Sequence, residues 1–418
     1  MSIALGLSAA AVGAAAEQLQ PVVQRTPLMR SDRLSDELGG SVWLKREDLQ
    51  IGRSYKVRGA YNLISSISAE ERHRGVVCAS AGNHAQGVAL SCSALGIQGR
   101  VFVPSATPRQ KRERIRAIGG RWVELVVGGA TYDEAGAAAL ECSRTKGAVL
   151  AHPFDDPRTI AGNGTVAMEL HDQCPEPVGT VVVPVGGGGL LAGMALWLRE
   201  RCPGVRIVGA EPEGAASMRA ALSAGRPVAL PSVDTFVDGA AVGTVGSLTY
   251  PLVRDLVDEV VTVPEGAVCT EMLSLYQVDG VIAEPAGALA SAAARHLTRV
   301  SAEGAVICIV SGGNNDVSRY ADILERSLVH EGLKHYFLVT FPQQPGALRR
   351  FLDDVLGPDD DITLFEYVKK SNRETGPALV GIELPRAGDL PGLLERMAVS
   401  PLQIERVPPG SPLFTFLV

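Results

Sequence analysis

Short apolar runs alternate with Ala-rich stretches from about residue 40 to residue 330. Six runs are apolar or β-branched almost throughout rather than alternating with polar residues: 75–79, 100–103, 122–127, 180–185, 206–210 and 305–310. Such runs are typical of strands buried on both faces of parallel sheets. Stretches between them, such as 85–95 and 190–200, predict crossover helices. The pattern therefore predicts an α/β fold with ligand chemistry at the carboxyl ends of the strands.

The pattern changes near residue 330. Beyond it we expect strands at 336–341, 362–368, 378–384 and 402–407, and helices at 345–356 (with Pro in the first turn) and 390–397. The order β-α-β-β-α-β is the ferredoxin-like pattern. We therefore predict an α/β domain over residues 1–330 and an α+β ferredoxin-like domain over 331–418. At the other end, residues 1–16 lack a basic segment, which favours a surface helix over a signal peptide.

Composition narrows the class of partner. The chain has 418 residues with 39 basic and 46 acidic side chains, and the resulting net charge of −7 argues against nucleic acid. No apolar run is long enough to span a bilayer. The seven cysteines are scattered and form no C-x-x-C pair, which favours a reduced cytoplasmic interior over disulfides or a zinc site. We therefore expect a cytoplasmic protein that acts on small molecules.

A tetraglycine at residues 186–189 stands between a predicted strand and a helix that opens at Leu190. Glycines there allow consecutive backbone N–H groups to converge on an anion at the helix N-terminus. No Gly-Lys-Ser/Thr follows, so it is not a Walker A motif, and the G-x-G-x-x-G fingerprint with its later acid is absent. A monophosphate therefore fits better than a nucleoside triphosphate or a dinucleotide, although a flexible turn is the simpler alternative.

Lys56 lies in Ser-Tyr-Lys-Val-Arg-Gly-Ala, outside any charge run. It is either a surface lysine at a helix start or a lysine that forms a Schiff base, for which a buried setting would lower the amine pKa. The turn from Ser80 to His84 follows the run 75–79 and offers amide and N–H groups for a ring hydroxyl and a carboxylate. Ser80 or Asn83 could instead cap a helix, and His84 on its own is more often structural.

Three further polar residues follow predicted strands. Ser311, in Ser-Gly-Gly-Asn, could hydrogen-bond a pyridine nitrogen without protonating it, or could belong to an ordinary turn. Glu211 and Glu284 stand at probable strand ends. Each could face the site, ligate a cation or remain solvated, and the sequence leaves these alternatives open.

Taken together, these residues resemble the pyridoxal-phosphate enzymes of the tryptophan-synthase β fold type (fold type II). Within that group the chain is similar to the biosynthetic threonine dehydratases, or threonine ammonia-lyases. The matching stretches run in family order over about three quarters of the chain and are residues 26–28, 44–50, 54–60, 80–89, 152–157, 186–190 and 311–314. The resemblance implies a catalytic domain of two open, mostly parallel sheet subdomains over 1–330. It also implies one ACT-like regulatory domain over 331–418 that binds branched-chain amino acids.

The resemblance also implies roles for individual residues. Lys56 carries pyridoxal phosphate as a Schiff base and is catalytic, Asn83 hydrogen-bonds the ring 3-oxygen, and Ser311 faces the pyridine nitrogen. The phosphate is cradled by the backbone of Gly186, Gly187, Gly188, Gly189 and Leu190. The substrate-binding turn consists of Ser80, Gly82, Asn83 and His84.

Two departures from the family pattern stand out. Asn163 takes a place where relatives often carry Gln. Relatives that bind a divalent cation use a Glu, a backbone carbonyl and an acid, and here Glu211 and Ala215 fit but Ser217 replaces the acid. This argues against a divalent site, so we predict no metal ligands and leave open a monovalent cation.

The activity implied by the resemblance is the conversion of L-threonine to 2-oxobutanoate and ammonia by a homotetramer, inhibited by isoleucine and with valine as a further effector. One alternative is a serine dehydratase or serine racemase of the same fold, from which the C-terminal module distinguishes this chain. Another is a non-catalytic amino-acid sensor. Retention of Lys56, Asn83, the tetraglycine and Ser311 disfavours the sensor.

Overall fold

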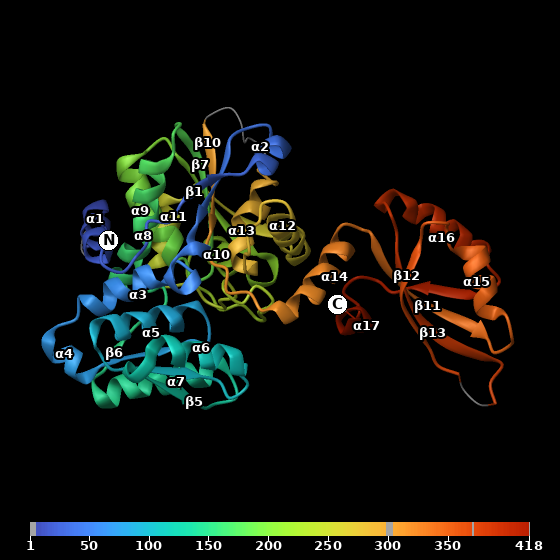
Figure 1. Cartoon of the computed structure of the whole chain (residues 1–418), viewed down its shortest axis with the longest axis horizontal. Helices are drawn as coiled ribbons and strands as arrows, with labels where there is room; N and C mark the ends of the chain where they lie inside the picture. The colour runs from blue at the N-terminus through green and yellow to red at the C-terminus, as the bar shows by residue number, and fades with distance from the viewer. Residues whose placement is uncertain (1–5, 298–303, 370–371, 418) are drawn as a thin grey trace. The chain divides into compact units, whose positions relative to one another are not determined.

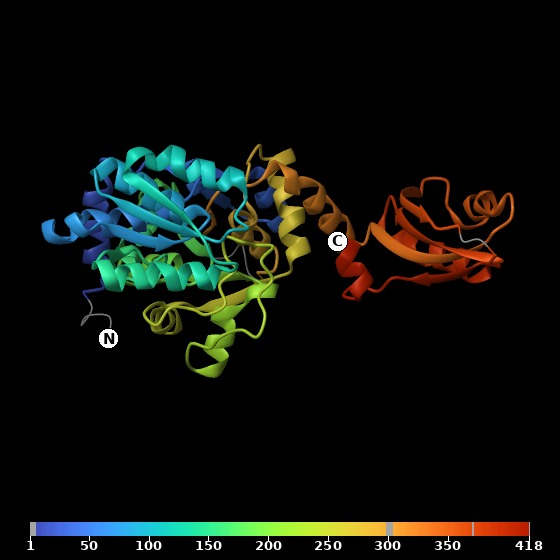
Figure 2. The ribbon, with the colours of Figure 1, turned by 90° about the horizontal axis from the view of Figure 1, so that it is seen from below.

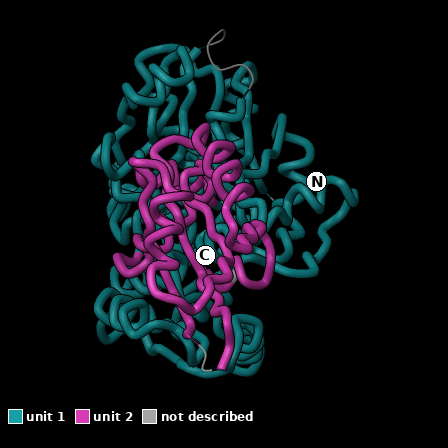
Figure 3. Tube along the Cα trace, turned by 90° about the vertical axis from the view of Figure 1, so that its right-hand side faces the viewer, with its two compact units in different colours: residues 1–265, 274–315 teal, residues 266–273, 316–418 magenta. Residues whose placement is uncertain are grey.

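A computed structural model describes residues 6–297, 304–369 and 372–417. The chain divides into two compact units, residues 1–265 with 274–315 and residues 266–273 with 316–418 (Figure 3). The second unit begins before the boundary predicted at residue 331, because it includes α14 (Tyr320–His330). That helix joins the second unit because its Glu325 side chain bonds Lys334 and Tyr336 of β11 (Lys334–Pro342).

The core of the first unit is a six-stranded sheet. Its order is β1 (Leu28–Arg30), β2 (Val42–Arg46), β10 (Ala305–Val310), β7 (Val178–Pro184), β8 (Arg206–Pro212) and β9 (Glu259–Val263). Only the pairing of β1 with β2 is antiparallel. Figure 1 shows α8 (Pro157–Gln173) and α9 (Gly189–Arg201) on one side of this sheet and α13 (Pro285–Ala294) on the other. Burial on both faces explains why β7 and β10 read as continuous apolar runs.

A second, all-parallel sheet completes the first unit. Its order is β5 (Val123–Val127), β4 (Gly99–Val103), β3 (Val76–Ala79) and β6 (Val149–Leu150). Helices pack on both faces, as Figure 2 shows. They are α3 (Lys56–Ser65), α5 (Asn83–Leu95), α6 (Arg109–Gly119) and α7 (Tyr132–Lys146). The prediction of burial on both faces is wrong for β5, because it is an edge strand with Glu124 and Val127 exposed.

The remaining helices of the first unit connect these layers. They are α2 (Asp32–Leu38), α4 (Ala69–Arg74), α10 (Ser217–Ala224) and α11 (Thr249–Leu256), while α12 (Glu265–Gln277) is divided between the units. The predicted N-terminal surface helix is α1 (Ala9–Leu19), and residues 1–5 lie outside the described part of the chain. It is not confined to the surface, because Val12 and Leu19 are buried. Within the described residues, no helix combines the length and apolar character needed to cross a membrane.

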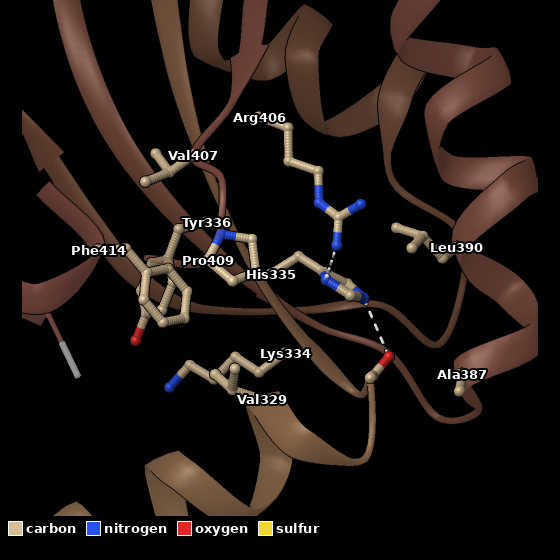
Figure 4. A pocket seen from close by; sticks show the side chains of 11 residues that line it. Val329, Lys334, His335, Tyr336, Ala387, Leu390, Arg406, Val407, Pro409 and Phe414 are labelled. Atoms are coloured by element: carbon tan, nitrogen blue, oxygen red, sulfur yellow. Dashed lines mark hydrogen bonds between the residues drawn. The ribbon is translucent and has the colours of Figure 1, made fainter. Parts of the chain in front are cut away.

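The second unit has the antiparallel order β12 (Asp361–Tyr367), β13 (Thr375–Glu383), β11 and β14 (Gln403–Arg406). Along the chain, α15 (Ala347–Val355) lies between β11 and β12, and α16 (Leu390–Val399) lies between β13 and β14, which is the predicted ferredoxin-like pattern. A short helix, α17 (Pro412–Leu417), follows. Side chains from the end of α14, the start of β11 and α17 are among those that line a cavity of about 200 Å³ in this unit, shown in Figure 4. The helix predicted to begin at residue 345 begins later, because Gly346 in the left-handed region is its N-cap and leaves Pro345 outside.

Candidate active site

The predicted site residues gather where parallel strands end. β3 leads into the turn from Ser80 to His84, β7 into the tetraglycine, and β10 into Ser311. The amide of Tyr55 donates to the Ser311 carbonyl oxygen at 3.1 Å, which places Lys56 directly beside the end of β10. Sequence segments far apart in the chain therefore meet at one place, as the carboxyl-end rule for α/β sheets requires.

Lys56 is the first residue of α3 and is half-buried. Its Nζ lies 3.4 Å from the Pro153 carbonyl oxygen and 5.2 Å from the centre of the Tyr55 ring. Burial, and then the charge of Lys56, lower the pKa of His84 to about 3. Burial is also the main cause of the lowered pKa of His152, to which Lys56 adds. Both imidazoles are therefore neutral, so neither places a further positive charge beside the Lys56 amine.

The tetraglycine fits a small anion. Gly188, with a φ of +89°, is the N-cap of α9, and no side chain caps that helix. The first-turn N–H groups of a helix have no intrahelical acceptor, so they remain available to an anion. Side chains would not be tolerated here: a Cβ on Gly187 would overlap the Phe154 ring, and one on Gly189 would lie 2.9 Å from the Phe154 Cα. The residues present therefore fit the phosphate of pyridoxal phosphate.

The Asp155 carboxylate holds the loop at residues 247–249, which contacts the tetraglycine. Asp155 accepts hydrogen bonds from the amides of Ser247 and Leu248 at 2.9 and 2.8 Å. The neighbouring Thr249 hydroxyl donates to the Gly187 carbonyl oxygen at 2.6 Å. Because Phe154 packs on the glycines and Asp155 binds the loop that contacts them, residues 152–155 link Lys56 to the anion cradle.

The Asn83 amide is held from two sides. Its Nδ2 donates to Glu284 Oε1 at 2.6 Å, and its Oδ1 accepts from Asn314 Nδ2 at 2.7 Å. One Nδ2 hydrogen is left for a ligand oxygen. Glu284 is buried, and burial followed by the charge of Asp238 raises its pKa to about 7. Of the alternatives left open for Glu284, the structure selects the one in which it faces the site.

The turn before α5 is open to a ligand, but not through His84. Gly82 is the N-cap of α5 and no side chain caps the helix, so neither Ser80 nor Asn83 is the cap. The Gly82 amide donates to Ser80 Oγ at 3.2 Å. The His84 imidazole is buried, with Nε2 lying 2.8 Å from the Ala151 carbonyl oxygen. The His84 imidazole therefore has Ala151 as its partner, and the prediction that His84 contacts substrate stays a prediction that its backbone N–H would have to carry.

Ser311 is buried at the end of β10. Its Oγ donates to the Ala286 carbonyl oxygen at 3.1 Å. Gly312 pairs with Ser54 in an isolated antiparallel bridge, which fixes the two segments side by side. To donate to a ring nitrogen, the Ser311 hydroxyl must turn away from Ala286.

Glu211 is buried and acts as a helix cap. Its two carboxylate oxygens accept from the amides of Met218 and Arg219 at 2.6 and 2.9 Å, in the first turn of α10. Burial raises its pKa to about 7 despite these bonds. Among the described residues, no group of three or more His, Cys, Asp or Glu side chains could hold a metal ion.

A buried ion network anchors the helix that carries Lys56. Arg58 bonds Glu47 at 2.8 Å and Glu169 at 2.7 Å, and Lys45 also bonds Glu169, at 2.6 Å. Arg58, Glu47 and Lys45 are essentially inaccessible to solvent. Two cations and two carboxylates balance, so the network ties β2 and α8 to α3 without a net buried charge.

Several of these contacts were not predicted. Asn314 and Glu284 stood in motifs that the sequence displayed, but their contact with Asn83 spans 231 and 201 positions. Phe154 and Asp155 lie in a stretch that matched the family, which was a usable signal. Thr249 lies in a stretch without any such pattern, so the sequence carried no sign of its contact with Gly187.

Comparison with known proteins gives two family matches. Residues 19–312 match the family described as "Pyridoxal-phosphate dependent enzyme". Residues 325–417 match the "C-terminal regulatory domain of Threonine dehydratase". The two matches together span most of both units.

Individual relatives agree with these matches. The biosynthetic L-threonine dehydratase IlvA of Mycobacterium tuberculosis is 60% identical over 414 residues, covering 99% of this chain and 96% of that protein. The Bacillus subtilis protein of the same name is 48% identical, covering 96% and 95%. Among solved structures, processed threonine deaminase isoform 2 from Solanum lycopersicum matches with a TM-score of 0.71 and 39% identity, covering 76% and 93%. Maize serine racemase matches with a TM-score of 0.71 and 34% identity, covering 78% and 98%.

Proposed function

The chain belongs to the pyridoxal-phosphate-dependent threonine dehydratases, and we propose from that membership how its own residues carry out the reaction. The reaction eliminates water from L-threonine, and hydrolysis of the resulting enamine then gives 2-oxobutanoate and ammonia. The observation that carries this conclusion is 60% identity over 99% of the chain, spanning the catalytic and the regulatory matches alike.

When bound, pyridoxal phosphate supplies an aldehyde that condenses with amines and a ring that withdraws electrons from the substrate Cα. We assign the aldehyde-binding amine to Lys56. With substrate in place of Lys56 on the aldehyde, the Lys56 Nζ would be free to take the proton from Cα as the general base. The half-buried position of Lys56, whose Nζ lies 3.4 Å from the Pro153 carbonyl oxygen, supports this assignment. Loss of the β-hydroxyl follows, and water converts the released enamine to 2-oxobutanoate and ammonia.

The cofactor-binding residues are assigned by the groups they present. Gly186 to Leu190 would bind the phosphate through backbone N–H groups, supported by the uncapped N-terminus of α9. The remaining Nδ2 hydrogen of Asn83 would bind the ring 3-oxygen. The Ser311 hydroxyl would bind the pyridine nitrogen as a neutral donor, which keeps the ring a modest electron sink and favours prompt loss of the hydroxyl.

The substrate carboxylate would lie against the turn formed by Ser80, Gly82 and Asn83. Support comes from the uncapped first turn of α5, whose N–H groups and dipole favour an anion. The backbone N–H of His84 belongs to this turn, while its imidazole does not contribute.

We further propose that isoleucine inhibits the enzyme through the second unit, with valine as a second effector. The match of residues 325–417 to a regulatory domain supports this. We propose that the enzyme is a homotetramer. We also propose that it is cytoplasmic, which its seven free cysteines support.

The test is 2-oxobutanoate release from L-threonine by the purified protein, with and without isoleucine. We expect turnover that isoleucine suppresses. Lys56→Ala should lose both turnover and the visible absorbance of the bound cofactor, whereas Lys146→Ala, at an exposed position at the end of α7, should keep both. A Lys56→Ala protein that retains both properties would contradict the assignment.

A serine dehydratase or racemase is the second candidate, because maize serine racemase matches the fold as well as the tomato threonine deaminase does. The regulatory match favours threonine, since it is described as part of threonine dehydratase. Relative rates on L-serine and L-threonine decide between them.

A further inference from the structure

Glu284 is a buried acid beside the candidate active site, and the backbone fixes its place. It is the N-cap residue of α13, but its side chain does not cap the helix. Its amide donates to the Gly312 carbonyl oxygen at 3.0 Å, just beyond the end of β10. A Cβ on Gly312 would lie 2.2 Å from Glu284 Oε1, so the carboxyl occupies space that only glycine leaves open. The carboxyl therefore has a fixed position beside β10 and a task other than capping.

The surroundings of this carboxyl favour its neutral form. The charged groups that act on it are Asp238 and Lys111, which form an ion pair of 2.8 Å with each other. Burial first, and then Asp238, raise the pKa of Glu284 to about 7, against the opposing effects of Lys111 and of hydrogen bonds from the Asn83 side chain and the Asn314 backbone. Burying a carboxyl is costly unless it is hydrogen-bonded, so these two hydrogen bonds compensate for the burial.

A backbone carbonyl fixes which way the Asn83 amide points. The Gly52 carbonyl oxygen can only accept, and it receives a hydrogen bond from Asn314 Nδ2 at 2.8 Å. The same Nδ2 donates to Asn83 at 2.7 Å, so the Asn83 atom on that side is the accepting Oδ1. Asn83 Nδ2 is consequently the atom that faces Glu284, at 2.6 Å from Oε1. The chain of bonds from Gly52 to Glu284 therefore allows one orientation of this amide.

The same chain of bonds joins the two sheets of the first unit. Asn83 begins α5, which packs on the four-stranded sheet, whereas Glu284 precedes α13, which packs on the six-stranded sheet (Figure 1). Asn83 thus reaches the cofactor site from one sheet and is held there by residues next to the other. Without an acceptor at position 284, the amide would lose one of its two restraints.

We propose that Glu284 is a positioning residue for the cofactor. Its carboxyl oxygen takes one Nδ2 hydrogen of Asn83 and thereby directs the other at the ring 3-oxygen. The inference rests on the proposed function, from which it takes the assignment of Asn83 to the 3-oxygen. Because Glu284 acts through Asn83, it need not touch the cofactor or the substrate, and a carboxamide at this position would serve as well as the protonated acid.

The test measures the absorption spectrum and the dissociation constant of the bound cofactor in the full-length enzyme at pH 6. Ionisation of the 3-oxygen changes the spectrum of pyridoxal phosphate, so the spectrum reports the hydrogen bond from Asn83. Glu284→Ala should alter the spectrum and weaken cofactor binding about fivefold, within the range for one lost hydrogen bond. Glu284→Gln keeps an acceptor oxygen and is uncharged, as the acid largely is at this pH, so it should match wild type in both measurements. Glu17→Ala, at an exposed position on α1, is the control.

Asn83→Ala separates this role from the assignment on which it rests. An unaltered Asn83→Ala spectrum overturns both the contact of Asn83 with the 3-oxygen and the role of Glu284. If Asn83→Ala alters the spectrum and Glu284→Ala does not, the contact stands and the positioning role is overturned. A Glu284→Gln spectrum as altered as that of Glu284→Ala also overturns the role, because an acceptor oxygen would not have preserved the contact. Glu284→Leu, which fills much of the same space without an acceptor, takes the place of Glu284→Ala if that variant does not fold.

Discussion

Glu284→Gln should stabilise the protein much more at alkaline pH than at pH 5. The substitution keeps the oxygen that accepts from Asn83 Nδ2 at 2.6 Å, and it removes a buried carboxylate whose pKa is raised to about 7. Because the folded state binds this proton more tightly than the unfolded chain does, the ionised carboxylate opposes folding.

The size and sign of the effect follow from the two pKa values. Below the ordinary value of 4.5 the carboxyl is protonated in both states and contributes nothing. Stability falls as the pH rises between 4.5 and about 7, and the loss is complete above that range. At about 1.4 kcal/mol for each pH unit, the difference amounts to roughly 3 kcal/mol.

The assay is urea denaturation of the holoenzyme at pH 5 and pH 8.5, with cofactor held at one saturating concentration. Glu17→Gln, at an exposed position on α1, is the control and should show no such pH dependence. A stability difference between Glu284→Gln and wild type that is the same at both pH values would refute the reasoning, as would a variant less stable than wild type at pH 8.5.

Three further substitutions test the site. Gly187→Ala should cost about 1–3 kcal/mol of stability and weaken cofactor retention, because its Cβ would overlap the Phe154 ring; visible absorbance after dialysis measures the retention, and full retention would contradict the cradle. Arg58→Met should destabilise by about 3–5 kcal/mol because it leaves Glu47 buried without its cation, and an unfolding midpoint equal to wild type would argue against the network. Ser311→Ala should keep the cofactor but lower kcat, and unchanged steady-state kinetics would remove its assigned role.

Much of the architecture could be predicted because its signals are local. The run 305–310 became β10 residue for residue, and the glycines at 186–189 stand where a strand meets a helix. β2 was not predicted, because its sequence, Val-Trp-Leu-Lys-Arg, ends in two charged residues and does not form a continuous apolar run. The burial of Lys45 depends on remote partners, among them Glu169, which lies 124 positions away and forms an ion pair with it.

The sequence by itself determined the kinds of group available: one lysine outside a charge run, four consecutive glycines, and polar turns after apolar strands. Only the tertiary structure decided how these groups are used. It turned the His84 imidazole inward to Ala151, and it brought Glu284 to Asn83 across 201 positions. The physical reason is that burial sets both the pKa of an ionisable group and its need for a partner, and burial depends on segments remote in the chain.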